Sequence, residues 1–376
     1  MRIGRREFLY SCGGCLAAVA GAGLISPLRA SLDRTPGEDI PDHEAQFWEP
    51  RESLRVQCTL CPRGCRVDDL ERGYCGVREN KGGKYVTRVY GAACAVNVDP
   101  IEKKPFFHFL PGTKAFSLAT AGCNIDCAFC QNWEISQTRP EQVDVYHLPP
   151  RETASAAMQS GSRSVAFTYT EPVVFYEYMY DTALAARERG LRAVMVSNGY
   201  IQEKPLTRLC GALDAIKVDL KSFREKYYKE VCAGELAPVL DALKTIHGSG
   251  TWLEIVYLMV PTLNDSAAEI TELCGWVREN LGPDVPLHFT RFHPMYRLTR
   301  LPSTPAASLE RALKIGREAG LHYVYLGNLP GHPSESTLCP SCGAVVVRRV
   351  GYAVLETAIE DDRCKACGKP VAGVWT

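Results

Sequence analysis

Short apolar runs rich in β-branched residues recur along the middle of the chain, and this pattern limits its possible folds more than any other feature. The runs lie at residues 116–121, 164–170, 193–198, 215–220, 253–260, 287–292 and 323–328. Stretches with apolar residues at helical spacing separate most of them, at residues 171–190, 265–282 and 303–320. Strands that alternate with helices indicate βαβ units and a parallel sheet. We therefore expect an α/β fold with a full or partial α/β barrel, and a flat doubly wound sheet is the alternative.

The composition is that of a globular protein and favours metal binding. Hydrophobic residues make up 46% and charged residues 23% of the 376 positions, close to the globular average. Lys and Arg together number 43, as do Asp and Glu, so a nucleic-acid partner has no electrostatic support. The 17 cysteines occur as C-x2-C pairs and a triplet, which favours metal ligation over a disulfide framework.

Residues 1–30 carry the features of a twin-arginine export signal. Arg5 and Arg6 precede an apolar run at residues 16–28, and a cleavage site is expected at residues 28–30. A chance basic start with a membrane-surface helix is the alternative. No later segment reaches the roughly 18 uninterrupted apolar residues of a membrane span. We expect a periplasmic or membrane-associated protein with no stable transmembrane span after signal removal, or a cytoplasmic one if the signal is vestigial.

A polar, proline-rich stretch at residues 31–52 is interpreted as a linker, and a Cys-rich module at residues 53–112 follows it. The spacing C-x2-C-x3-C-x9-C is formed by Cys58, Cys61, Cys65 and Cys75. Four thiols in so short a stretch indicate a fold organised by a metal. Structural zinc and an auxiliary iron–sulfur cluster both fit this spacing.

A second Cys-rich module closes the chain at residues 333–376, after a barrel expected at residues 113–332. Two C-x2-C-G turns separated by 21 residues contain Cys339, Cys342, Cys364 and Cys367. This pattern is typical of a structural zinc ribbon or a rubredoxin-type knuckle that holds a single iron. The cysteines that lack partners at ligand spacing, which we expect to be small buried hydrophobic residues, are Cys94, Cys210, Cys232 and Cys274.

The stretch GCNIDCAFC contains three cysteines, Cys123, Cys127 and Cys130, with gaps of three and two residues. A cubane cluster has four irons, so three thiolates leave one iron with an open coordination position for a small molecule. Catalytic zinc sites follow the same logic, because an incomplete protein ligand set leaves room for substrate. The triplet follows the first apolar run, at the carboxyl end of the strand, where α/β barrels build their active sites.

The motif C-x3-C-x2-C after a first strand, with Phe129 before the last cysteine, resembles the signature of radical S-adenosylmethionine (SAM) enzymes. The string DPIEKKP…HFLPG…GCNIDCAFCQNWEISQ is similar to one branch, the AmmeMemoRadiSam system radical SAM enzyme, which is related to the pyruvate formate-lyase activating enzymes. The resemblance covers residues 56–367. It implies a partial (βα)6-type radical SAM barrel flanked by the two Cys-rich modules.

The resemblance also implies a set of cofactors and a reaction. The cysteine triplet would ligate a [4Fe-4S] cluster whose open iron binds the amino and carboxylate groups of SAM. An electron donor would reduce the cluster, and SAM would be cleaved to methionine and a 5′-deoxyadenosyl radical that abstracts hydrogen from a substrate. The sequence does not name this substrate, which could be a protein or peptide, a lipid or a small metabolite.

Six further positions match motifs of the family at the ends of successive strands, and the resemblance assigns them to the neighbourhood of SAM: Glu171, Ser197, Asn198, Asp219, Lys221 and His293. The family has a Gly-Gly-Glu motif at the first of these positions. Here Tyr169 and Thr170 replace the two glycines, which puts in doubt a close approach of the backbone to the methionine part.

Each of these positions also has a purely structural interpretation. Glu171 could be a charge at a helix N-terminus. Asp219 could pair with Lys221, because residues two apart share one face of a strand. Asn198 with Gly199 could form only a turn, and His293 before Pro294 could be a structural histidine.

Taken together, these patterns favour a radical SAM enzyme with an unknown substrate. An activating enzyme that installs a glycyl radical on a protein partner is the alternative among enzymes. A non-catalytic iron–sulfur electron carrier is the alternative from another class, and a zinc-organised scaffold is a third. Cleavage of SAM separates the first two hypotheses from the others.

Overall fold

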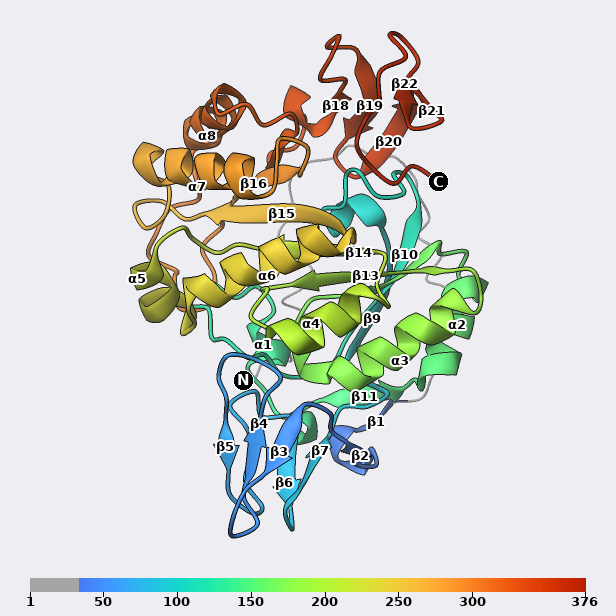
Figure 1. Cartoon of the computed structure of the whole chain (residues 1–376), viewed down its shortest axis with the longest axis vertical. Coiled ribbons are helices and arrows are strands. Elements are labelled where there is room, and N and C mark those ends of the chain that lie inside the picture. The colour runs from blue at the N-terminus through green and yellow to red at the C-terminus, as the bar shows by residue number, and fades with distance from the viewer. Residues whose placement is uncertain (1–33) are drawn as a thin grey trace, which may run out of the picture. The chain divides into compact units, whose positions relative to one another are not determined.

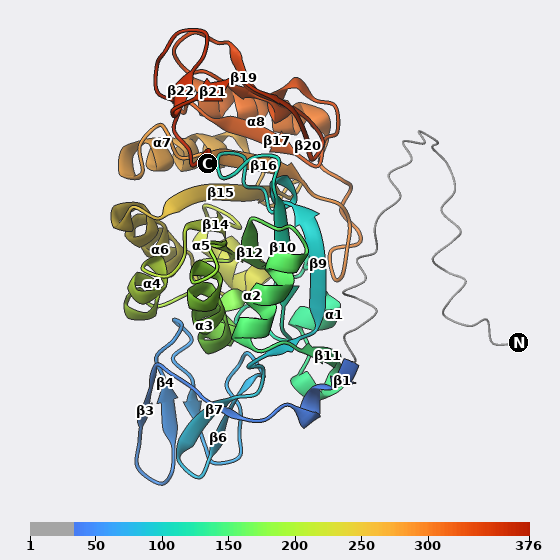
Figure 2. The same ribbon diagram turned by 90° about the vertical axis from the view of Figure 1, so that its right-hand side faces the viewer.

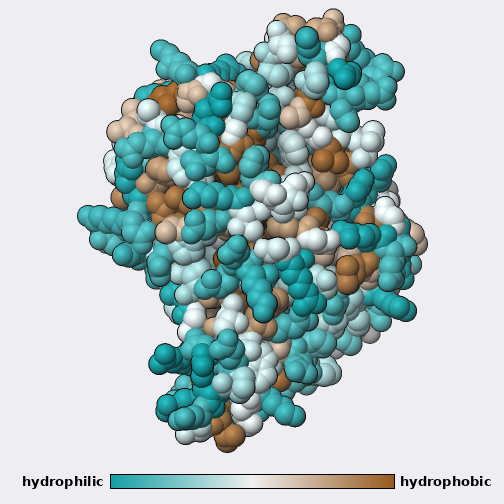
Figure 3. All heavy atoms as spheres, viewed as in Figure 1, coloured by the Kyte–Doolittle hydropathy of each residue, from teal (hydrophilic) through white to brown (hydrophobic). Residues whose placement is uncertain are grey.

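The structure is a computed structural model that describes residues 34–376, and every structural statement below concerns these residues. Asp33–Thr376 form one compact unit. The twin-arginine signal predicted for residues 1–30 lies outside the described residues. Within them, no helix combines the length and the apolar character that a membrane span requires. On the face shown in Figure 3, hydrophilic surface predominates and hydrophobic patches are small and separate.

An eight-stranded sheet forms the centre of the molecule, with the strand order β17-β16-β15-β14-β13-β12-β10-β9. Its strands are β9 (Ala95–Pro100), β10 (Lys114–Ala119), β12 (Ser164–Phe167), β13 (Arg192–Ser197), β14 (Ala215–Asp219), β15 (Trp252–Met259), β16 (Leu287–Arg291) and β17 (Val324–Gly327). All neighbouring pairs from β10 to β17 are parallel, whereas β9 pairs antiparallel with β10 at one edge. Every predicted apolar run overlaps one of these parallel strands.

The longer helices lie along one side of this sheet (Figure 1). The longer ones are α2 (Pro150–Gln159), α3 (Tyr176–Arg187), α4 (Glu203–Cys210), α6 (Leu236–Ser249), α7 (Ala267–Asn280) and α8 (Ala306–Glu318), and the short ones are α1 (Trp133–Ser136) and α5 (Glu225–Tyr227). Right-handed crossovers that always step in the same direction place all their helices on one face. The strand order never reverses, so the flat doubly wound alternative is excluded and the expected α/β fold with a partial barrel is confirmed.

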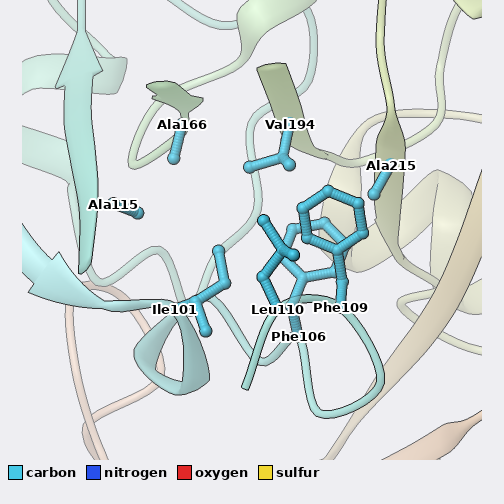
Figure 4. Packing of buried hydrophobic residues seen from close by; sticks show 8 residues of the cluster. All are labelled: Ile101, Phe106, Phe109, Leu110, Ala115, Ala166, Val194 and Ala215. Carbon is cyan, nitrogen blue, oxygen red and sulfur yellow. The ribbon is translucent and has the colours of Figure 1, made fainter. Parts of the chain in front are cut away.

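The connection between β9 and β10 closes the end of the barrel at which the parallel strands begin. Ile101, Phe106, Phe109 and Leu110 of this connection are buried together with small side chains from four strands (Figure 4). Those strand residues are Ala115, Ala166, Val194 and Ala215. The small side chains leave room for the large apolar ones of the connection, which therefore form a hydrophobic plug. Any site inside the barrel must open at the opposite end.

Residues 34–50, interpreted from the sequence as part of a linker, are instead built into sheets. The three pairings are β1 (Arg34–Pro36) with β11 (Asp144–His147), β2 (His43–Glu44) with β7 (Lys84–Thr87), and β3 (Trp48–Pro50) with β4 (Val56–Cys58). Ile40 and Ala45 are buried between them. The linker prediction is wrong here because short edge strands tolerate the proline and polar side chains that marked the segment as a linker.

The two Cys-rich segments are both composed of short strands. The remaining strands of the N-terminal Cys-rich segment are β5 (Arg66–Val67), β6 (Arg78–Lys81) and β8 (Ala92–Ala93). The strands of the C-terminal Cys-rich segment are β18 (Thr337–Leu338), β19 (Val345–Val350), β20 (Ala353–Thr357), β21 (Ile359–Glu360) and β22 (Arg363–Cys364). The second segment packs back on the plug connection, since the Val374 N–H donates to the His108 carbonyl and the Leu110 N–H to the Val374 carbonyl, at 2.7 Å each. Figure 2 shows these segments at opposite ends of the sheet.

A buried ion pair joins the first Cys-rich segment to the barrel. Arg78 in β6 pairs with Glu177 in α3, and both side chains are almost completely inaccessible, at 1% and 0% exposure. The guanidinium also donates to the Gln46 carbonyl at 3.0 Å, and the carboxylate accepts from the Gln46 N–H at 2.6 Å. These contacts connect residues 99 positions apart in the sequence.

Candidate functional site

A cavity of about 540 Å³ lies on the inner face of the sheet, toward the carboxyl ends of the strands. Its volume lies within the range of about 300–1,000 Å³ that is usual for small-molecule sites. The three cysteines of the triplet line it, as do five of the six residues that the resemblance assigns to SAM: Glu171, Ser197, Asn198, Asp219 and Lys221. The structure therefore brings the cysteines and these strand ends together around one space.

The loop after β10 that carries the triplet is shaped by a glycine. Gly122 has a φ of 97°, and a Cβ built on it would lie 2.8 Å from the Cys75 carbonyl oxygen and 2.6 Å from the Val77 Cγ1 atom. Only glycine fits this conformation and this approach. The Ser136 hydroxyl lies 3.1 Å from the Cys130 sulfur, and the Asn198 amide donates to the Cys123 sulfur at 3.9 Å.

The sulfur atoms of the triplet are spaced differently from those of the C-terminal cysteine set. In residues 34–376, one group of three or more potential ligands has all its ligand atoms within 4.8 Å of one another, and it is the C-terminal set of four cysteines. Tetrahedral zinc, with Zn–S bonds of about 2.3 Å, holds its sulfurs about 3.8 Å apart. Each thiolate of a cubane binds a different iron, so its sulfurs stand further apart. The triplet forms no such compact group, so its three sulfurs are more widely spaced than those of the C-terminal set.

Cys232 is a neighbour of the triplet that the sequence interpretation missed. It was expected to be a partnerless buried residue, but its thiol donates a hydrogen bond to Cys127 and thereby lowers the pKa of Cys127. The π-helical turn Tyr228–Cys232 is also tied to the cysteine loop, because the Asp126 N–H donates to the Cys232 carbonyl at 2.9 Å. A sequence separation of about a hundred residues hides this partnership from any motif.

If the triplet holds the iron–sulfur cluster that the resemblance implies, replacing Cys232 by alanine is expected to make the reduction potential of that cluster more negative. Hydrogen bonds to ligand sulfurs stabilise the reduced cluster, and this variant removes one of them. The measurement is a potentiometric titration followed by electron paramagnetic resonance. Cys274→Ala is the matched control, since Cys274 is equally buried, in α7, and only burial shifts its pKa. An unchanged potential in Cys232→Ala, or an equal shift in the control, would contradict the assignment.

Glu171 ties together the ends of two strands. Its carboxylate accepts hydrogen bonds from the Ser197 hydroxyl at 2.7 Å, the Asn198 N–H at 2.8 Å and the Val173 N–H at 3.1 Å. The last of these caps the 3-10 turn Pro172–Phe175, as the structural interpretation of this residue anticipated. Burial raises the pKa of Glu171 to about 7 against these hydrogen bonds.

Tyr169, which replaces a family glycine, has a backbone conformation that glycine favours. Its φ of 69° lies in the left-handed region, where a side chain costs roughly 1–2 kcal/mol. Its hydroxyl donates to Asp99 at 2.5 Å and accepts from Lys104 at 3.1 Å. These contacts hold the strained residue in place.

Asp219 and Lys221 pair with each other, and a third residue joins them. Asp219 accepts from Lys221 at 3.0 Å and also from Lys217, which stands two positions earlier in β14 and so on the same face. Burial by itself would raise the pKa of Asp219, but the two ammonium groups outweigh it and hold the pKa at about 2. The expected pairing of Asp219 with Lys221 is therefore found, although in the wall of the cavity and not on the outer surface.

His293 does not lie where the sequence placed it. The side chain is exposed and contacts the Ser303 hydroxyl at 3.1 Å, outside the cavity. β16 ends two residues earlier, at Arg291, and the chain then turns outward. The histidine of this strand that lines the cavity is His288, which contacts Glu254 at 2.8 Å. The prediction that His293 lies near the cofactor therefore finds no support.

The two four-cysteine sets differ in geometry. In the C-terminal set the Cys339 and Cys367 sulfurs are 3.7 Å apart and those of Cys342 and Cys364 are 3.8 Å apart. In the N-terminal set, Cys58, Cys65 and Cys75 raise the pKa of Cys61 electrostatically in addition to its burial, so the thiols are neighbours without closing to single-ion distances. A second cavity of about 590 Å³ is lined by both Cys75 and Cys123.

The sequence interpretation also passed over the lysines of the cavity. Lys103 and Lys104 come from the plug connection, and Lys217 from β14. A visible indication existed for Lys217, because it interrupts the otherwise apolar run AIKVDL. A charged residue within a buried strand requires a partner or a function.

Comparisons with known proteins agree with this site. The family model of the radical SAM superfamily matches residues 117–274, which include the triplet. An uncharacterized protein of Methanocaldococcus jannaschii is 43% identical over 330 residues, which cover 87% of this chain and 98% of that protein. The benzylsuccinate synthase activating enzyme of Thauera aromatica is 23% identical over 140 residues, covering 37% of this chain and 42% of that enzyme.

Among solved structures, a radical SAM methyltransferase from Sphaerobacter thermophilus has a TM-score of 0.46 and 17% identity, over 58% of this chain and 67% of that one. The family model and the extended similarity to the archaeal relative, together with the cysteine triplet at the mouth of a partial barrel, lead to one conclusion. The chain belongs to the radical SAM superfamily and is an enzyme of that superfamily.

Proposed function

We propose that Cys123, Cys127 and Cys130 hold a [4Fe-4S] cluster and that the enzyme uses SAM to abstract hydrogen from a substrate. The observation that carries this proposal is the placement of three widely spaced thiols on the wall of a cavity that also receives Glu171, Asn198 and Lys221. When bound, the cluster and SAM would supply an electron transfer that yields methionine and a 5′-deoxyadenosyl radical. An external electron donor is needed, as in other enzymes of the superfamily.

The residues of this chain would bind and orient SAM beside the cluster. Lys221 is the cation for the SAM carboxylate, because burial and Asp219 position its ammonium group at the cavity wall. Asn198 would help to hold the cluster, because its side-chain amide donates to the Cys123 sulfur. Glu171 fixes the ends of β12 and β13 against each other, and its buried carboxylate, which accepts three hydrogen bonds, has acceptor capacity left for the SAM amino group.

The test is anaerobic reconstitution with iron and sulfide, followed by incubation with SAM and dithionite and measurement of 5′-deoxyadenosine. Deoxyadenosine from the intact protein would establish the proposed chemistry. A full cluster without any deoxyadenosine would favour the electron-carrier alternative. In that event the Tyr169 and Thr170 positions, which depart from the family's glycines, would be the first to examine.

The second candidate function is activation of a glycyl-radical enzyme. It is favoured by the similarity to the benzylsuccinate synthase activating enzyme. An activating enzyme must take a glycine-bearing loop of its protein partner into the cavity. Deoxyadenosine formation that depends on a partner protein, with a glycyl radical signal in electron paramagnetic resonance, would separate this candidate from an enzyme with a small substrate.

The C-terminal four-cysteine set is proposed as a structural zinc site, because its sulfur distances match those of tetrahedral zinc. Cys342→Ser is expected to remove about one equivalent of zinc and leave the iron content unchanged, as measured by mass spectrometry of the metals. Cys210→Ser is the control, since Cys210 in α4 has no cysteine partner in the described chain. Iron loss in place of zinc loss would identify a rubredoxin-type site.

The N-terminal set is proposed to hold an auxiliary cluster, with structural zinc as the alternative. Its thiols do not close to the distances of a single ion, and Cys75 and Cys123 line one cavity, which brings the two cysteine sets close together. The same metal analysis distinguishes the two possibilities through the iron content of a Cys61→Ser variant.

A further inference from the structure

The end of the cavity that lies against the plug connection carries an excess of positive charge. Four lysines line the cavity and share two aspartates. Asp99 pairs with Lys103 at 2.9 Å and with Lys104 at 2.6 Å. Asp219 pairs in the same way with Lys217 and Lys221. Each carboxylate is therefore divided between two ammonium groups, which leaves two positive charges without a counterion.

The remaining acidic side chains of the cavity do not supply this counterion. Glu102 faces the guanidinium of Arg349 at 3.7 Å, and both side chains are fully buried. Glu171 forms no ion pair with a lysine of the described chain: its carboxylate is held by three hydrogen bonds, is assigned above to the SAM amino group, and acts on Lys217 only from a distance. SAM does not supply it either, because its sulfonium and ammonium groups outnumber its single carboxylate.

Two of the lysines are buried and close enough to repel each other. The side chains of Lys104 and Lys217 are 2% and 4% exposed. Burial lowers the pKa of Lys104 to about 8, and the neighbouring Lys217 contributes to that decrease. Two buried ammonium groups that face one space are unfavourable unless an anion lies between them.

The hydrogen-bond donors of Lys217 are incompletely used. An ammonium group has three N–H donors, and the hydrogen bonds of the described chain give Lys217 one partner, Asp219. Lys104 has two partners, Asp99 and the hydroxyl of Tyr169. A buried donor without a partner is costly. The unused donors therefore point to a ligand that accepts hydrogen bonds.

Tyr169 belongs to the same arrangement. Its ring lies against Lys104, with the ammonium 4.4 Å from the ring centroid, and its hydroxyl contacts Asp99 and Asn97. The left-handed backbone of this residue is a local strain, and strain of this kind concentrates at functional sites. The contacts of Tyr169 hold Lys104 at the cavity wall. A glycine at position 169 would have no side chain to make them.

We infer that the substrate carries an anionic oxygen group, a carboxylate or a phosphate, which binds between Lys104 and Lys217. This inference rests on the proposed function, because it names the chemical class of that enzyme's substrate. The anion would anchor the substrate at the closed end of the cavity, with its remaining part directed toward the cysteine triplet. The two lysines recognise the substrate by charge and hydrogen bonds, and the hydrogen to be abstracted lies elsewhere on the same molecule.

The experiment is calorimetric titration of the reconstituted protein with inorganic phosphate and, separately, with acetate. SAM is present throughout, so that its carboxylate occupies Lys221, and no reductant is added, so that no turnover occurs. The wild-type protein is expected to bind one of the two anions at a single site. A preference for phosphate or for acetate identifies which anionic group the substrate carries.

Lys104→Met and Lys217→Met are each expected to weaken this binding by about tenfold or more, since each removes a charged hydrogen bond. Both variants should fold, because Asp99 keeps Lys103 and Asp219 keeps Lys221. Circular dichroism and the cluster content check this. Lys314→Met is the matched control, because Lys314 lies in α8 with 75% of its side chain exposed.

The inference is overturned if neither anion binds in the presence of SAM, or if both variants bind as tightly as the wild type. It is also overturned for Lys217 if Lys217→Met weakens the binding of SAM and leaves that of the anion unchanged, because the lysine would then serve the SAM carboxylate. Failure of the proposed function is a separate result. It would show as absent deoxyadenosine from the wild-type enzyme with dithionite, whether or not an anion binds.

Discussion

Cys127→Ala is expected to lose its cluster on reconstitution and to form no detectable 5′-deoxyadenosine from SAM. Removal of an outer-shell partner of a metal typically lowers affinity or activity by about 10–100-fold, and loss of a ligand itself should exceed that range. Cys127 is also the cysteine of the triplet whose sulfur accepts a hydrogen bond from Cys232. The measurements are iron content, the absorbance of the cluster and chromatography of deoxyadenosine.

The control for this prediction is Cys274→Ala, which removes an equally buried thiol from α7, outside the cavity. It should keep the cluster and the deoxyadenosine rate of the wild type. A Cys127→Ala protein that still carries a full cluster and cleaves SAM would show that the triplet is not the ligand set. Equal losses in both variants would indicate a general effect on folding and would contradict a specific role of Cys127.

Glu177→Met is expected to lower the free energy of unfolding by about 3–5 kcal/mol, the range for removal of one member of a buried ion pair. The reason is that Arg78 would remain charged and 1% exposed, with the Gln46 carbonyl as an acceptor but without its carboxylate. The measurement is urea unfolding followed by circular dichroism, at unchanged metal content. The loss of unfolding free energy should be large because the Arg78–Glu177 pair joins β6 to α3.

The double variant Arg78→Met/Glu177→Met tests the cause. Replacement of both charges by apolar side chains of similar volume should recover much of the lost stability. Glu49→Gln is the surface control, because its pair with Arg51 is about half exposed on both sides, at 56% and 52%, and such pairs contribute about 0–1 kcal/mol. A Glu177→Met protein no less stable than Glu49→Gln would show that the buried pair does not hold the two parts together.

The alternation of strands and helices was predictable because each buried parallel strand is an almost continuous apolar run. All seven runs became strands of one sheet, and the order of these strands excluded the doubly wound alternative. The segment 34–50 was not predictable in the same way. Its short strands depend on backbone pairing with β4, β7 and β11, and such pairing leaves little trace in the side chains of the segment itself.

The candidate site was predictable where a local motif carried it. Glu171, Ser197, Asn198, Asp219 and Lys221 follow strands of one parallel sheet, so their convergence on one cavity follows from the topology. His293 is not among the residues that line the cavity, because it stands two residues beyond the end of its strand. The chain leaves β16 at Arg291 and turns outward before the histidine.

By itself, the sequence determined the α/β class and the place of the cysteine triplet after the first parallel strand, because both depend on short local patterns of residue type and spacing. Only the tertiary structure decided that Cys232 donates to Cys127, that Arg78 lies buried against Glu177, and that Lys104 and Lys217 face one cavity. The partners in each of these contacts are separated by about a hundred residues. No local periodicity encodes contacts of that kind, since they exist only once the plug connection, the sheet and the helices have packed together.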